Sequence, residues 1–169
     1  MNGRFARLYL IGGIAGLLSG ILMLISGYLV IFRLRDAYSG TPDEQMEFIA
    51  SQPLAGIVHG LSVVSLILIV PTIIALLALF SEIATARGFL GTGFAVFWIV
   101  IGLVGHLSQT APLRSLGELY SDPATREMAL SIYHVSEEFW EALSLTATFF
   151  CALMCLCSGL ALIAKRNRS

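Results

Sequence analysis

Four long stretches without Asp, Glu, Lys or Arg divide this chain, and they decide what it can fold into. They cover residues 8–32, 53–80, 88–112 and 142–164. Each is longer than the roughly 20 residues that an α-helix needs to cross about 30 Å of hydrocarbon. None has the polar face that a helix of a soluble bundle turns to water. We predict an all-α integral membrane bundle of four transmembrane helices, spanning about 8–32, 53–80, 88–112 and 139–164, in one domain of residues 1–169.

The composition agrees with a protein embedded in a lipid bilayer. The chain is 57% hydrophobic and 12% charged, whereas about 25% charged residues is usual for soluble domains. A net charge of −1 gives no reason to expect nucleic acid as a partner. The first stretch is too long for the apolar part of a signal peptide and ends without an Ala-x-Ala-like site, so we expect it to be a retained helix.

The distribution of Lys and Arg predicts the orientation. Four spans place the two termini and the 81–87 connection on one side, with six cations: Arg4, Arg7, Arg87, Lys165, Arg166 and Arg168. The other side has four: Arg33, Arg35, Arg114 and Arg126. Cations collect on the cytoplasmic side of membrane proteins. We expect a multi-pass protein of the inner (plasma) membrane with both termini in the cytoplasm.

Both predicted outer segments carry helix-start signals. Thr41 followed by Pro42, Asp43 and Glu44 resembles an N-cap with Pro and acids in the first turn, which predicts a short interfacial helix near 42–51. Asp122-Pro123 predicts another near 123–136, which either lies on the membrane surface or runs on into the fourth span. The segment near 123–136 has an apolar stripe that ends at Phe139. It consists of Met128, Ile132, Val135 and Phe139. The interfacial aromatic residues would be Tyr120, Tyr133, Phe139 and Trp140.

Small residues recur at helical spacing inside the spans. On the first span they are Gly12, Gly16 and Gly20, and on the fourth Ser144, Thr148 and Cys151. Such ridges let another helix approach closely, so we interpret them as inward faces of the bundle, with a dimerisation or partner surface as the alternative. The cysteines in this part of the chain are interpreted as packing residues. Pro71 should kink the second span.

A few ionisable residues are not explained by packing. His59 and His106 each lie about five residues inside the outer boundary of adjacent antiparallel spans, so their depths match. Glu141 lies at the boundary of the fourth span, and Glu138 and His134 continue its stripe outward. An ionisable residue within a span is by default a functional-site hypothesis.

Several kinds of chemistry fit these residues. Imidazole and carboxylate groups suit a transition metal, which would be held by His59, His106 and Glu141. The two histidines could instead clamp a haem or ligate chlorophyll-type pigments, or take part with Glu141 in a proton or cation pathway. The simplest alternative is that they hydrogen-bond to one another or to Glu141 and lock the bundle. No motif of a hydrolase, zinc protease or nucleotide-binding enzyme is present.

The entry to the second span, Pro53-Leu-Ala-Gly-Ile-Val-His59, follows a glycine-rich first span. In this respect the chain resembles a broad group of small, uncharacterised bacterial membrane proteins with four helices. The resemblance covers about residues 8–110 and implies a bacterial origin but no activity.

The sequence therefore favours a non-catalytic membrane protein. We expect an accessory or structural subunit of a larger membrane complex, or a small oligomer, whose partners are the lipid bilayer and other membrane subunits or itself. The alternatives are a metal-, haem- or pigment-binding redox protein that uses His59 and His106, and a proton or cation pathway through Glu141.

Overall fold

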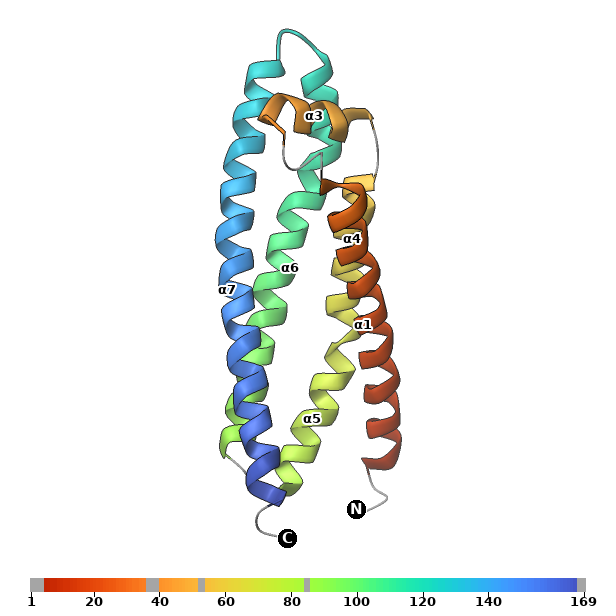
Figure 1. Ribbon diagram of the computed structural model, residues 1–169, viewed down its shortest axis with the longest axis vertical. Coiled ribbons are helices and arrows are strands. Elements are labelled where there is room, and N and C mark those ends of the chain that lie inside the picture. The colour runs from red at the N-terminus through yellow and green to blue at the C-terminus, as the bar shows by residue number, and fades with distance from the viewer. Residues whose placement is uncertain (1–4, 36–39, 52–53, 84–85, 167–169) are drawn as a thin grey trace.

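The computed structural model (Figure 1) describes residues 5–35, 40–51, 54–83 and 86–166, so Pro53 of the resemblance lies outside the described residues. All its elements are α-helices: α1 (Ala6–Arg33), α3 (Pro42–Ser51), α4 (Leu54–Leu68), α5 (Val70–Ile83), α6 (Ala86–Ser121) and α7 (Arg126–Arg166). Four helical stretches are long and apolar enough to cross a membrane, namely α1, the α4–α5 pair, α6 and α7. The all-α prediction and its four apolar helices are confirmed.

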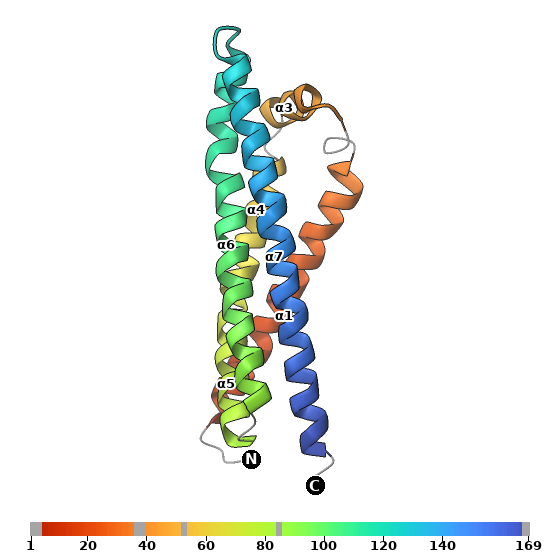
Figure 2. The same ribbon diagram turned by 90° about the vertical axis from the view of Figure 1, so that its left-hand side faces the viewer.

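The long helices run along one axis, and α3 lies across one end of them (Figures 1 and 2). We call this the α3 end and the opposite one, where α1 begins and α7 ends, the termini end. The packing is open rather than closed into a square bundle. α1 packs chiefly on α4 and α5, and α7 packs chiefly on α6, while α6 also packs on α4 and α5.

The contact of α1 with α4 and α5 depends on small residues. A β-carbon at Gly12 would lie 2.5 Å from the Cβ of Ala75, so only glycine allows this approach. Gly16 faces Thr72, but Gly20 is exposed with open space around it. The face continues instead through Ser19 and Ser26, which are buried, so Gly20 is not part of the inward face of α1.

Pro71 divides the second apolar stretch into two helices. α4 ends at Leu68 and α5 begins at Val70, with Ile69 as a turn between them. Proline has no N–H to donate and its ring clashes with the preceding turn, which explains a break at this point. The predicted kink is confirmed, and it tilts α5 away from the direction of α4 (Figure 1).

α6 and α7 both extend beyond their predicted limits. α6 continues past Pro112 to Ser121, and α7 begins at Arg126 and is continuous to Arg166. The prediction of a separate helix near 123–136 is therefore wrong, because that segment is the first part of α7. The structure instead agrees with the alternative, in which the segment runs on into the fourth apolar helix. The two helices project past α3 as a hairpin (Figure 2), closed by a turn in which the Ala124 N–H donates to Asp122 Oδ1 at 3.0 Å.

The hairpin and α3 share a small hydrophobic core, which we call the cap core. It consists of Met46, Leu116, Tyr120, Ala129 and Tyr133. Tyr133 is 1% exposed and its hydroxyl donates to Oε1 of Gln45 at 3.0 Å. Both tyrosines were expected at a membrane interface, and instead they are buried beneath α3.

The start of α3 is stabilised by the expected residues. The Thr41 N–H donates to Oε2 of Glu44 at 2.7 Å, and the Glu44 N–H donates to Oγ1 of Thr41 at 3.4 Å. This reciprocal pair is a capping box. The predicted short helix near 42–51 is confirmed as α3.

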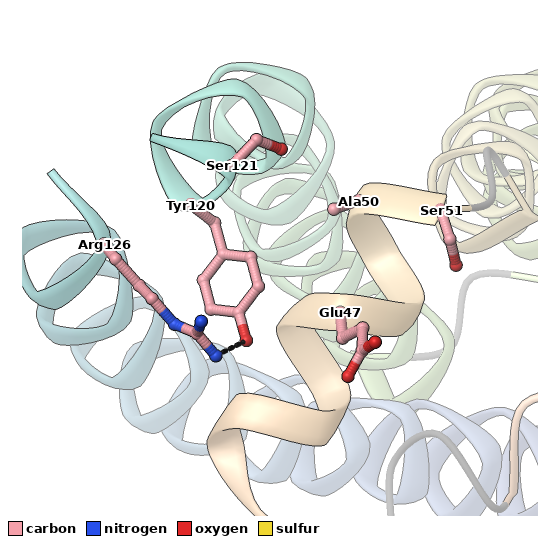
Figure 3. Close-up of a pocket in the computed structure, with 6 residues that line it drawn as sticks. All are labelled: Glu47, Ala50, Ser51, Tyr120, Ser121 and Arg126. Carbon is pink, nitrogen blue, oxygen red and sulfur yellow. Dashed lines mark hydrogen bonds between the residues drawn. The ribbon is translucent and has the colours of Figure 1, made fainter. Parts of the chain in front are cut away.

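α3 is tied to the hairpin by Asp43. Its Oδ1 accepts a hydrogen bond from Arg126 at 2.9 Å and one from the Tyr120 hydroxyl at 3.1 Å. These hydrogen bonds hold the pKa of Asp43 below its usual value. Arg126 also donates to the Tyr120 hydroxyl at 2.6 Å (Figure 3). An open pocket of about 470 Å³ lies beside them, with Glu47, Ala50 and Ser51 on its α3 side.

Candidate functional site

His59 and His106 meet at the boundary between α4 and α6. Their Nδ1 atoms lie 3.3 Å apart, and the centres of their rings are 5.6 Å apart. Since both atoms are Nδ1, one imidazole must carry its proton there and donate, while the other must carry its proton on Nε2 and accept. His59 is only 8% exposed. The matching depths expected from the sequence therefore correspond to direct contact.

Trp140 of α7 covers both histidine rings. Its ring centre lies 4.6 Å from that of His106 and 5.6 Å from that of His59, edge-on to the latter. Gly105 makes room for it, because a β-carbon there would lie 2.9 Å from Cζ3 of the indole. The site therefore consists of three aromatic rings from three helices.

The role of Trp140 was missed because its position beside a boundary suggested the membrane interface. A usable signal was present in the helical register. Trp140 precedes Ser144 and Thr148 by one and two turns, so it continues the small-residue face of α7 that was expected to point inward.

A cavity of about 120 Å³ lies next to the rings, toward the termini end. Its walls include Met23 of α1, Leu66 of α4, His106 of α6 and Trp140 of α7, so all four apolar helices contribute. The remaining wall is formed by Trp98, Ile101, Gly102, Leu143, Ser144, Ala147 and Thr148. Cavities that take drug-sized ligands are about 300–1,000 Å³, so this one suits an ion or a few water molecules.

The acidic candidates lie on the other side of Trp140. Glu138, Glu141 and His134 line an open groove of about 400 Å³ together with Glu137. His134 Nε2 and Glu138 Oε1 are 3.5 Å apart, but both side chains are largely exposed, and such surface pairs contribute little to stability. The groove and the cavity share Trp140 and Ser144 as walls.

The predicted metal site of His59, His106 and Glu141 is not assembled. The histidines are in contact, whereas Glu141 is exposed and lines the groove. Among the described residues, no group of three or more His, Cys, Asp or Glu side chains is placed to hold a metal ion. A haem or chlorophyll-type macrocycle does not fit either, because a ring of that size cannot enter a cavity of about 120 Å³.

Other buried polar groups join helices to one another. The hydroxyl oxygens of Ser26 and Ser62 lie 2.9 Å apart between α1 and α4. Gln109 of α6 is 1% exposed and donates from Nε2 to the Ser136 carbonyl oxygen of α7 at 2.8 Å. Each of these contacts is made within this chain, and none brings a nucleophile to an acid or base.

The small residues of α7 that were expected to face inward are only partly covered. Ser144 and Thr148 line the cavity, yet Thr148 is exposed, and Cys151 is half-buried. The Thr148 hydroxyl donates to the Ser144 carbonyl oxygen at 2.8 Å, so it needs no partner on another helix.

Comparison with known proteins adds no assignment. No family model matches this chain, and neither does any curated protein or solved structure. The functional argument therefore rests on the residues themselves.

Proposed function

We propose that this protein is a non-catalytic subunit of a membrane assembly, and that another membrane chain packs along its helix α7. It would lie in the inner (plasma) membrane with the α3 end outside and both termini in the cytoplasm. The orientation is supported by the excess of Lys and Arg on the side of the termini.

One observation carries this proposal, namely an apolar stripe on the part of α7 that projects past the spans. The stripe consists of Met128, Ile132, Val135 and Phe139. Their exposed fractions are 51%, 42%, 66% and 49%, while another side of the same segment buries Ala129 and Tyr133 in the cap core. The packing of this chain therefore leaves the stripe uncovered.

Lipid does not reach the far end of the stripe. Trp140 contacts His106, which lies about five residues inside the outer boundary, so on α7 the span starts near residue 135. Ile132 then lies about 5 Å and Met128 about 10 Å further out at about 1.5 Å per residue. The headgroup layer is only about 5–7 Å thick on each side of the hydrocarbon. Exposed apolar patches of this kind mark surfaces that another protein covers.

The surroundings of the stripe indicate what the partner would offer. Glu127, His134 and Glu138 are exposed on the neighbouring face, so the stripe has a mainly acidic border. The expected partner is a membrane helix that continues outside the bilayer with an apolar face and basic flanks, either in a second copy or in another subunit.

The test is to measure the mass of the particle after extraction of the full-length protein from its own membrane in a mild detergent. Light scattering coupled to chromatography should give more than one chain per particle. Ile132→Lys should release the monomer, because it places a charge in the proposed interface. Ser51→Lys is the matched control and should leave the assembly intact, because Ser51 is exposed on α3 and lies outside the stripe.

A monomeric parent protein, or an assembly that Ile132→Lys leaves unchanged, would reject the proposal. Folding of each variant is checked by its helical circular dichroism and thermal unfolding. Since Ile132 is exposed, both should match the parent protein.

A second candidate function is a cation pathway through Glu141. It is favoured by the groove, in which Glu141 lies directly across Trp140 and Ser144 from the cavity. Reconstituted vesicles should then show proton or Na⁺ flux that Glu141→Gln abolishes and Glu127→Gln preserves. Absence of flux with the parent protein would exclude this function.

A further inference from the structure

The cavity beneath Trp140 brings together side chains of different chemistry. A thioether from Met23 and an imidazole from His106 line it, and the indole of Trp140 closes it toward the groove. The second imidazole, His59, touches the first through Nδ1 at 3.3 Å. Each of the four apolar helices thus contributes one of these four side chains.

The donor set suits a soft ion best. Divalent ions such as Zn²⁺ take four ligands in structural sites, and hard ions require oxygen. Two imidazoles and a thioether supply three ligands and no oxygen, and the described part of the chain has no group of three or more His, Cys, Asp or Glu side chains that could hold a metal ion. Soft monovalent copper is selected by sulfur ligands and is also bound by imidazole.

We propose that His59, His106 and Met23 form a binding site for a soft monovalent metal ion, Cu⁺ or its analogue Ag⁺, with Trp140 as its lid. The ion would lie between the two Nδ1 atoms at the cavity, with the Met23 sulfur as a third ligand. The site does not depend on the proposed assembly along α7.

The geometry requires only a small adjustment. Metal–nitrogen bonds are about 2 Å long, so an ion in line between the two Nδ1 atoms needs them about 4 Å apart rather than 3.3 Å. Methionine has three rotatable side-chain bonds and adapts easily to a new position. The cavity beside His106 supplies the space for this movement.

Binding of the ion neither releases nor takes up a proton. In the empty site, one histidine carries its proton on Nδ1 and donates it to the Nδ1 of the other. When the ion binds, this proton moves to Nε2 of the same ring, so that both rings are neutral with Nε2–H and both Nδ1 lone pairs face the metal. No proton is lost and no oxidant or reductant is needed.

Trp140 lies close enough to attract the ion. Its ring centre lies 4.6 and 5.6 Å from the two imidazole centres, so an ion held between them is within the roughly 6 Å range of cation–π attraction. The acidic groove on its far side offers an entry route that favours cations.

The experiment is a titration of the full-length protein in detergent with Ag⁺, which requires no reductant. The cysteines bind the same ion, so the titration uses the background Cys151→Ser, Cys155→Ser, Cys157→Ser. We expect one Ag⁺ per chain by metal analysis and calorimetry. Since Trp98 also lines the cavity, fluorescence is recorded with Trp98→Phe added to the background, where the remaining Trp140 emission should be quenched.

Each ligand is tested with a control that keeps the fold. His59→Ala and His106→Ala should each weaken Ag⁺ binding by at least about tenfold, the loss usual when a supporting group of a metal site is removed. Met23→Leu preserves the apolar volume and leaves both histidines in place. A tenfold weaker binding of Ag⁺ by this variant would therefore show that the sulfur is a ligand. His134→Ala is the control and should bind as the background does, because His134 is exposed in the groove.

Three results would overturn the site. They are absence of stoichiometric Ag⁺ binding in the cysteine-free protein, binding that survives the double variant His59→Ala, His106→Ala, and binding that depends on His134 instead. If both histidine variants fail to fold, unaltered binding in Met23→Leu together with unquenched Trp140 fluorescence in the Trp98→Phe background rejects the proposed geometry.

Discussion

Ser19 and Ser65 exchange hydrogen bonds across the contact of α1 with α4. Each hydroxyl donates to the carbonyl oxygen of the other residue at 2.9 Å, and the two hydroxyl oxygens are 3.0 Å apart. Both side chains are fully buried. The pair thus satisfies polar groups on two helices while keeping their backbones close.

We predict that Ser65→Ala lowers the free energy of unfolding by about 1 kcal/mol, the scale of hydrogen bonds between membrane helices. The measurement is reversible unfolding in mixed micelles. Ser131→Ala is the matched control, because the exposed Ser131 donates only to the Glu127 carbonyl oxygen of its own helix. Equal losses in both variants would contradict a role for the exchange.

Gly105→Ala should displace the indole of Trp140. The new β-carbon would lie 2.9 Å from the ring, so the ring must shift away and its contact with His106 must change. We expect a shift in tryptophan emission and a loss of about 1–3 kcal/mol, the usual cost of overpacking. Gly93→Ala is the control, since a β-carbon there meets nothing within 4 Å. Unchanged emission in Gly105→Ala would contradict the contact.

The attachment of α3 should weaken in acid. Hydrogen bonds from Arg126 and Tyr120 lower the pKa of Asp43 in the folded protein, so docking favours the ionised form. The stabilisation is complete above about pH 4, the ordinary pKa of Asp, and is lost as the pH falls through the lowered value. Glu44, whose pKa is lowered by hydrogen bonds from Thr41, acts in the same direction.

Hydrogen exchange of the α3 amides measures the attachment of α3. The exchange rates are corrected for the intrinsic effect of pH and compared with those of α1 in the same sample. Protection of α3 should fall below pH 4. Asp43→Asn should reduce the protection at pH 7 and leave only the weaker pH dependence due to Glu44. A pH profile of Asp43→Asn identical to that of the parent protein would disprove the assignment.

The orientation can be tested with single cysteines in the cysteine-free background. Ser51→Cys, exposed at the end of α3, should react with a membrane-impermeant maleimide in intact spheroplasts. Ala86→Cys, exposed at the start of α6, should react only after permeabilisation. The opposite pattern would place the α3 end in the cytoplasm.

Hydropathy predicted the helices but not where two of them end. An uncharged stretch shows where hydrocarbon can surround a helix, whereas α6 and α7 continue past it as an ordinary amphipathic pair. Leu116 and Tyr120 on one helix, and Ala129 and Tyr133 on the other, are spaced by one turn and fill the cap core. That spacing was present in the sequence, but the partner of these faces, α3, comes from a distant segment.

For the candidate site, the depth of the residues could be predicted from the sequence, but the direction in which they face could not. Counting residues inward from each boundary placed His59 and His106 at one depth, since helical rise is constant. Rotation about the helix axis is decided by packing, and the only sequence signal for it was the register of Trp140 with Ser144 and Thr148. Packing brought Trp140 over the histidines and left Glu141 in the groove.

The continuity of α6 and α7 into the hairpin has a mechanical consequence. No loop separates the cap core from the membrane-length parts of these helices, so a push on the α3 end would tilt α6 and α7 as one lever. The lever would slide against α4, and His59 and His106 touch across that boundary. A force applied to the hairpin would therefore be carried along both helices to the hydrogen bond between the two imidazoles.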